Sequence, residues 1–156
     1  MIAFLSLGSN LGDREQNLRR AISELQKRTG TIVSQSAFFT TEPWGFQSAN
    51  TFVNVCIGLH TPLQPSDLLR ATQDIERRMG RTQKSTDGTY HDRTIDIDLL
   101  LCGDLVIDQP TLHIPHPLMA ERLFVLQPLA QIAQNQSVPG TGMSVGEMLS
   151  ALEARS

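Results

Sequence analysis

Short runs of apolar, β-branched and aromatic residues alternate with longer amphipathic segments along the chain. The runs predict four main strands, over residues 2–7, 31–41, 52–59 and 93–101. After the fourth strand, the turn at Cys102-Gly103-Asp104 predicts a hairpin with a short strand at 105–107. In strand 52–59, one face carries Val53, Val55, Ile57 and Leu59, and the other carries Phe52, Asn54, Cys56 and Gly58.

Apolar residues at helical spacing predict helices between these strands. The first has the stripe Leu18, Ala21, Ile22 and Leu25, an N-terminal capping pair in Asp13 and Gln16, and Gly30 at its end. The second begins at Pro65, ends at Gly80 and has Leu68, Thr72, Ile75 and Met79 on its inner face, with Gln73 and Glu76 on its flank. Later helices contain Arg122 to Leu129 and begin at Ser144, whose capping partner is Glu147.

The order strand, helix, strand, strand, helix, strand predicts an α+β fold with a ferredoxin-like βαββαβ core. We expect a mainly antiparallel sheet with helices packed on it, an added hairpin and a C-terminal helix. The chain has 156 residues, enough for one domain with a substantial core. We therefore expect a single domain over residues 1–156.

Composition and charge narrow the classes of function. The hydrophobic content of 40% and charged content of 19% are ordinary for a soluble globular protein, and the net charge of -3 argues against a nucleic-acid binder. Residues 2–5 look like a first strand rather than a signal peptide, and no run is long enough to span a membrane, so we expect a cytoplasmic protein. Cys56 and Cys102 lie in apolar strands and are expected to be buried free thiols.

The most informative stretch is the strand that carries Asp96 and Asp98. Because side chains in a strand alternate, both carboxylates face the same side, roughly 6 to 7 Å apart, and repel each other unless a cation lies between them. Two hard oxygen donors without a neighbouring Cys or His favour Mg²⁺. A solvated polar face on an edge strand is the alternative, but Leu99 to Leu101 indicate a buried strand, where unpaired acids are costly.

Several other polar features have both a structural and a functional interpretation. Gly8 to Asn10 form either a simple turn or an anion-binding loop, and the loop around Trp44 is either packing or a lid. Asn54 beside Phe52 is either a satisfied core amide or a reader of a stacked heterocycle. Residues 81–93 form either a solvated loop or a cationic polyphosphate clamp, and His116, between two prolines, is either a phosphate donor or a surface imidazole.

Three motifs in sequence order resemble a known family. They are Gly8-Ser9-Asn10-Leu11, Arg93-Thr94-Ile95-Asp96-Ile97-Asp98-Leu99-Leu100 and Pro115-His116-Pro117. The chain resembles the 6-hydroxymethyl-7,8-dihydropterin pyrophosphokinases, folate-pathway enzymes that transfer diphosphate from ATP to the pterin hydroxymethyl group and release AMP. The resemblance covers nearly the whole chain.

The resemblance implies a set of site residues and small-molecule partners. Asp96 and Asp98 would hold two Mg²⁺ ions and, with Arg81 and Arg93, form the catalytic set. The implied pterin site consists of Thr41, Pro43, Gly45, Phe52, Asn54 and Phe124, with the two phenylalanines stacking on the ring. The implied ATP site consists of Gln73, Glu76, Arg81, Lys84, Arg93, His116 and Arg122.

The chain departs from the family pattern before the aspartates. Gln83 and Tyr90 stand where an Arg and a Trp are frequent, and Asp92 precedes Arg93 where a Pro or small residue is frequent. We expect a monomer that uses only small-molecule substrates. Two other functions stay open from sequence: a Mg²⁺-dependent kinase that releases ADP, and a non-catalytic ferredoxin-like module that binds a small ligand.

Overall fold

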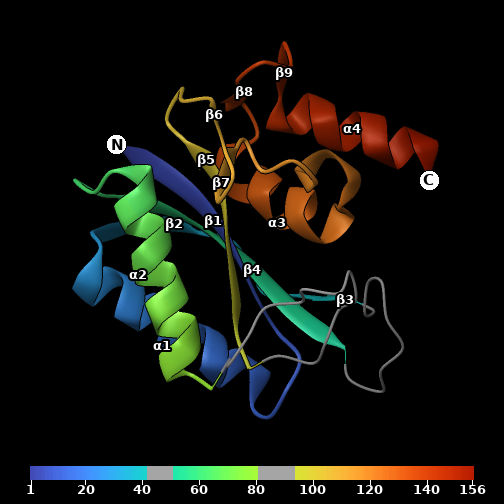
Figure 1. Cartoon of the computed structure of the whole chain (residues 1–156). Coiled ribbons are helices and arrows are strands. Elements are labelled where there is room, and N and C mark those ends of the chain that lie inside the picture. The colour runs from blue at the N-terminus through green and yellow to red at the C-terminus, as the bar shows by residue number, and fades with distance from the viewer. Residues whose placement is uncertain (42–50, 81–93) are drawn as a thin grey trace.

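A five-stranded antiparallel sheet forms the centre of the molecule (Figure 1). The structure is a computed structural model that describes residues 1–41, 51–80 and 94–156. Its central strands are β1 (Ile2–Ser9), β2 (Thr31–Gln35), β3 (Phe39–Thr41), β4 (Phe52–His60) and β5 (Asp96–Cys102). The order is β2-β4-β1-β5, with β3 also paired to β4, which confirms the predicted ferredoxin-like core.

Helices cover both faces of this sheet. The helices are α1 (Arg14–Arg28), α2 (Pro65–Arg78), α3 (Leu123–Ala133) and α4 (Val145–Arg155), and a 3-10 turn, η1 (Met119–Glu121), precedes α3. Figure 1 shows α1 and α2 on one side of the strands and α3 and α4 on the other. None of these described helices has the length and apolar run that crossing a bilayer requires.

The strand β4 shows why the sheet needs helices on both faces. Val53, Val55, Ile57 and Leu59 join the apolar cluster beneath α1 and α2, whereas Cys56 joins the cluster beneath α3 and α4. The two faces therefore belong to two different cores, as the alternation of the sequence predicts.

The predicted helix starts are confirmed. Asp13 Oδ1 accepts a hydrogen bond from the Gln16 backbone N–H at 3.1 Å at the start of α1. At the start of α4, Ser144 Oγ accepts from Glu147 N–H at 3.1 Å, and Glu147 Oε1 accepts from Ser144 N–H at 2.9 Å. These contacts satisfy backbone donors that have no partner inside the helix.

The predicted continuous strand over 31–41 is wrong. It is divided into β2 and β3 by Ser36, whose N–H donates to Cys56 O and whose Oγ accepts from Cys56 N–H, both at 2.9 Å. The next N–H, of Ala37, donates to Gln131 Oε1 of α3 at 2.8 Å. A side-chain acceptor therefore takes the place of one backbone carbonyl at this point, and the strand is interrupted where Gln131 of α3 contacts it.

Other strand boundaries also differ from the predictions. The strand expected over 93–101 is β5, which begins only at Asp96 and ends at Cys102. Strand β1 continues through Gly8 and Ser9, which the sequence placed in a loop, because both residues pair with β4. The hairpin strand expected at 105–107 is instead β6 (Ile107–Gln109), which pairs with β7 (Leu112–Ile114) in a separate small sheet. A third pair joins β8 (Ser137–Val138) to β9 (Met143–Ser144) before α4.

Candidate active site

Asp96 and Asp98 lie on the same face of β5, as their spacing predicts. The intervening Ile97 is only 2% exposed and packs in the core on the α1 and α2 side, whereas both aspartates are half-buried. Asp96 pairs with Gly8 of β1, and Asp98 pairs with Ser6. The register shifts outside this region, between Phe4 and Leu5. The alternation of side chains between the two faces of β5 is therefore regular from Asp96 to Asp98.

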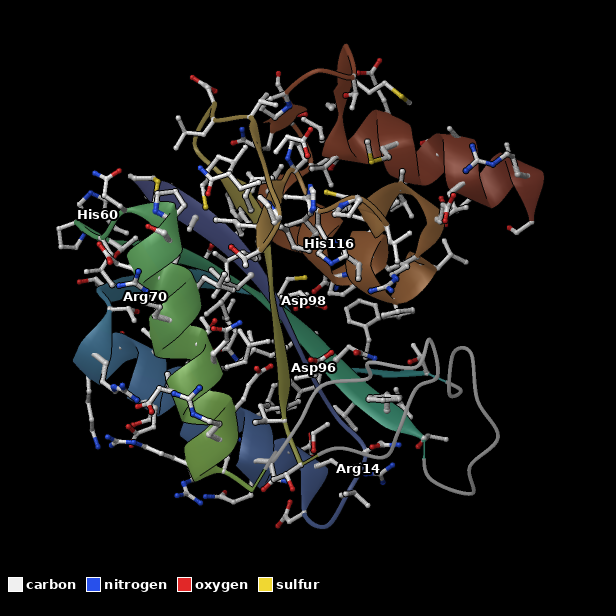
Figure 2. The ribbon with its side chains drawn as sticks, in the orientation of Figure 1. Arg14, His60, Arg70, Asp96, Asp98 and His116 are labelled. Atoms are coloured by element: carbon white, nitrogen blue, oxygen red, sulfur yellow. The ribbon has the colours of Figure 1, made fainter. Side chains whose placement is uncertain are left out.

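Two basic side chains face Asp98 from a distant part of the sequence. His116 Nε2 lies 4.0 Å from Asp98 Oδ1, and Arg122 Nη1 lies 4.0 Å from Asp98 Oδ2. Figure 2 shows Asp96 and Asp98 along β5 and His116 above them, towards α3. The Arg122 side chain is 7% exposed and that of Asp98 is 25% exposed, so this permanent positive charge acts on the carboxylate from a largely buried position.

The segment around His116 is tied to β5 by its backbone. The His116 N–H donates to Leu100 O at 3.0 Å, and the Ile114–Pro115 peptide bond immediately before it is cis. His116 Nδ1 accepts from the Leu118 N–H at 3.2 Å, so the other ring nitrogen, Nε2, points toward Asp98. The imidazole is thus oriented by its neighbours rather than free to rotate on the surface.

Asn54 occupies the same face of the sheet on β4. It is 4% exposed, and its Nδ2 donates to Thr41 Oγ1 of β3 at 2.9 Å. A Cβ atom on Gly8 would lie 2.8 Å from Asn54 Oδ1 and 3.5 Å from Phe52 Cδ1. The lack of a side chain at Gly8 therefore makes room for the Asn54 amide, whereas the distance to the Phe52 ring would be an ordinary van der Waals contact.

Arg122 lies next to both Asp98 and the ring of Phe124. The Arg122 guanidinium carbon lies 5.5 Å from the centre of the Phe124 ring, a distance typical of a cation–π contact. Both Phe52 and Phe124 are half-buried. The structure thus brings the described members of the predicted pterin site to the face that carries the carboxylates. These residues are Thr41, Phe52, Asn54 and Phe124.

The two α2 residues of the predicted ATP site differ in exposure. Gln73 is half-buried, but Glu76 is only 2% exposed, so its expected place on the helix flank is wrong. Glu76 Oε2 accepts a hydrogen bond from the Ile97 N–H at 2.8 Å. The inner residues of α2 pack against Ile97, and Glu76 reaches the backbone of β5 at the edge of the sheet.

Several predicted site residues lie outside the described part of the chain. They are Pro43, Gly45, Arg81, Lys84 and Arg93, together with the family departures Gln83, Tyr90 and Asp92. Their places in the site remain sequence-based expectations.

The donor set of the site fits a hard divalent cation. Within the described ranges, no cluster of three or more His, Cys, Asp and Glu forms a self-contained metal cage. Burial raises the pKa of Cys56 to about 12 and that of Cys102 to about 11, so both thiols are protonated at neutral pH. Two partly exposed carboxylates suit Mg²⁺, which commonly takes its remaining ligands from water and substrate phosphates.

Sequence reasoning missed two contributions to the site. Gly8 lies within β1 rather than in the loop that the sequence predicts, and a glycine within an apolar strand indicates close approach of another group. The tie between Glu76 and Ile97 had no signal in sequence, because it joins a helix to a strand across a tertiary contact.

Comparison with known proteins identifies the family. Residues 4–134 match the model of 7,8-dihydro-6-hydroxymethylpterin-pyrophosphokinase (HPPK). Two relatives carry the name 2-amino-4-hydroxy-6-hydroxymethyldihydropteridine pyrophosphokinase. The Porphyromonas gingivalis protein is 50% identical over 133 residues, covering 85% of this chain and 90% of the relative. The Bacillus subtilis protein is 42% identical over 134 residues, covering 85% of this chain and 78% of the relative.

Solved structures agree on the fold. A crystal structure of Plasmodium falciparum wild-type HPPK-DHPS superimposes with a TM-score of 0.75 at 15% identity, covering 99% of this chain and 41% of that one. An HPPK-DHPS crystal structure in complex with substrates gives a TM-score of 0.74 at 15% identity, covering 99% of this chain and 44% of that one. This chain thus spans less than half of those longer proteins. It belongs to the 7,8-dihydro-6-hydroxymethylpterin-pyrophosphokinase family and is a diphosphotransferase of folate synthesis.

Proposed function

We propose that this chain transfers the β,γ-diphosphate of ATP to the hydroxymethyl group of 6-hydroxymethyl-7,8-dihydropterin, in a Mg²⁺-dependent reaction. The hydroxyl oxygen bonds to the β-phosphorus, the bond from that phosphorus to the oxygen bridging to the α-phosphate breaks, and the hydroxyl proton is released. The products are AMP and the pterin diphosphate. The observation that carries the proposal is the placement of Asp96 and Asp98 on one face of β5, with Arg122 and His116 each 4.0 Å from Asp98.

Asp96 and Asp98 would hold the two Mg²⁺ ions that we propose. When bound, Mg²⁺ would offset the negative charge on the phosphates and lower the pKa of a coordinated hydroxyl. Arg122 and the oriented His116 would donate hydrogen bonds to phosphate oxygens beside these carboxylates. Because diphosphoryl transfer needs positioning and charge stabilisation, these side chains supply most of what the reaction requires without a covalent intermediate.

The pterin would bind over the neighbouring part of the same face. Phe52 and Phe124 would stack on the ring, and the Asn54 amide would hydrogen-bond its nitrogen-rich edge. Thr41 supports this arrangement because its hydroxyl holds Asn54 Nδ2 at 2.9 Å. We place Pro43 and Gly45 in the same pocket on the strength of the family resemblance.

The triphosphate of ATP would reach the carboxylates from the side of His116 and Arg122. We propose that Gln73, Arg81, Lys84 and Arg93 complete this site, with Arg81 and Arg93 stabilising the transferred charge. We further propose that residues 1–156 act as one catalytic domain, monomeric and cytoplasmic. All the described site residues lie on one sheet and on segments packed against it.

Product analysis tests this function directly. The protein is mixed with ATP, Mg²⁺ and 6-hydroxymethyl-7,8-dihydropterin, and the nucleotides are separated by ion-exchange chromatography, with parallel reactions that lack the pterin or the metal. AMP formed only in the complete mixture is the expected result. ADP as the product would indicate an ordinary kinase, and no nucleotide product would leave only ligand binding.

A further inference from the structure

The carboxylate of Glu76 is buried at the edge of β5, beside the residue that separates the two aspartates. Glu76 is 2% exposed, and its Oε2 accepts the Ile97 N–H at 2.8 Å. Strand β5 stands at the end of the five-stranded sheet, with β1 as its neighbour in that sheet. In an antiparallel pair the N–H groups of alternate residues point away from the partner strand, so a side chain of α2 occupies the place of a missing strand here.

The hydrogen bond from Ile97 to Glu76 holds the backbone of β5 between the two aspartates. Asp96 and Asp98 pair with Gly8 and Ser6 on the β1 side, while the Ile97 side chain packs into the core on the α1 and α2 face. The backbone between the two like charges is thus held by a ladder, by packing and by Glu76. A buried backbone N–H that loses its acceptor is costly, so the Glu76 contact is a substantial part of this constraint.

We infer that Glu76 is a positioning residue: by holding the Ile97 N–H, its side chain fixes the separation and direction of Asp96 and Asp98. This inference rests on the proposed function of the two aspartates as the metal-binding pair. It assigns Glu76 a role through the strand backbone, different from the direct ATP contact that the family resemblance implies. The acceptor oxygen is the feature that matters, since the contact is made to a backbone donor.

Two substitutions separate positioning from nucleotide binding. Glu76→Gln keeps an acceptor oxygen at the same reach, and we expect kcat within about threefold of the native value and an unchanged KM for ATP. Glu76→Ala removes the acceptor and leaves a buried N–H without it, and we expect kcat to fall roughly tenfold or more, with a higher Mg²⁺ concentration needed for half-maximal rate.

A measurement without substrate or metal tests the same contact. The amide hydrogen exchange of Ile97, followed by NMR in the metal-free protein, should become roughly tenfold or more faster in Glu76→Ala and change little in Glu76→Gln. Thr72→Val is the matched control, because Thr72 is a buried polar residue of the same helix whose Oγ1 donates a hydrogen bond to Leu69 O of that helix, at 2.8 Å. It should lower thermal stability while leaving kcat and Ile97 exchange near native values.

Three outcomes would overturn the inference. A large rise in the KM for ATP in Glu76→Gln, with kcat preserved, would show that the carboxylate charge acts on the nucleotide itself. Native kcat and native Ile97 exchange in Glu76→Ala would show that the contact constrains nothing. A loss of kcat in Thr72→Val equal to that in Glu76→Ala would reduce the effect to helix stability. If the native chain forms no AMP, the proposed function fails, while the exchange measurement still decides whether Glu76 holds Ile97.

Discussion

Gly8 on β1 and Asn54 on β4 are paired across the sheet so closely that a Cβ atom on Gly8 would stand 2.8 Å from Asn54 Oδ1. The other end of the same amide donates to Thr41 Oγ1. The amide therefore has room beside Gly8 on one strand, and a hydroxyl on another strand holds its nitrogen. This relationship places the pterin-reading group that we propose on the same face as the aspartate pair, on the other side of β1.

The first prediction concerns Gly8→Ala. The added methyl group must displace the Asn54 amide, because real Cβ atoms do not approach an oxygen to 2.8 Å. We expect the Kd for the pterin to rise roughly tenfold, with the Kd for ATP little changed, as measured by isothermal titration calorimetry. Gly12→Ala is the control, since Gly12 has a φ of 65° and open space around it. It should cost about 1 kcal/mol of stability without weakening pterin binding, and equal losses of pterin affinity in both variants would contradict the prediction.

The second prediction concerns Thr41→Val, which keeps the shape of the side chain but removes the acceptor for Asn54 Nδ2. Pterin affinity should weaken by about 1 kcal/mol, or roughly fivefold, because the amide loses the hydrogen bond that orients it. The neighbouring Thr40 is exposed on the same strand and does not share this contact. Thr40→Val should therefore bind the pterin normally, and unchanged binding by Thr41→Val would show that Asn54 needs no such support.

The third prediction concerns the charge of Asp98. Asp98→Asn preserves the size of the side chain but removes one of the two carboxylates, so we expect kcat to fall roughly a hundredfold or more while pterin binding stays largely intact. Asp108→Asn is a suitable control, because Asp108 is an exposed carboxylate that also faces a histidine, His113, at 2.9 Å. A strong loss of pterin binding in Asp98→Asn would mean that the metal site has been placed wrongly.

The fourth prediction concerns stability in acid. Hydrogen bonding to Arg28 is the main cause that lowers the pKa of Asp74, with Arg77 and Arg78 adding to it. A carboxyl with a lowered folded-state pKa stabilises the fold above its unfolded pKa, and this contribution is lost as the pH falls through the folded value. Below about pH 4, the urea concentration at the unfolding midpoint should therefore fall more steeply with decreasing pH for the native chain than for Asp74→Asn.

The control for that experiment is Asp67→Asn on the same helix. Asp67 is more exposed than Asp74 and faces one arginine, Arg70, at 3.8 Å. Its substitution should change the acid dependence less. The Asp74 effect should also shrink in high salt, because these are surface charges. Identical acid profiles for the native chain and Asp74→Asn would show that the arginine cluster contributes nothing to folding.

The fifth prediction concerns the thiols. Burial raises the pKa of Cys56 to about 12 and that of Cys102 to about 11, so both should resist iodoacetamide at pH 8 in the folded protein. Both should react readily once denaturant unfolds the chain, as mass spectrometry of the alkylated protein would show. Rapid labelling of either cysteine in the native state would mean that the core around it opens far more often than its burial suggests.

The sequence by itself determined the order of the core elements, the helix caps and the shared direction of Asp96 and Asp98. Each of these follows from local rules: side chains alternate along a strand, helices bury a periodic stripe, and caps satisfy backbone donors nearby in sequence. The motif around the two aspartates also carried enough information to indicate the family, which the comparisons confirmed.

Only the tertiary structure decided which groups meet those aspartates. His116 and Arg122 reach Asp98 because the segment before α3 packs on β5, and Glu76 reaches Ile97 because α2 packs at the sheet edge. The division of strand 31–41 at Ser36 likewise depends on contacts with β4 and α3. These contacts join residues far apart in the chain, and their geometry depends on how whole elements pack, which no local pattern of residues specifies.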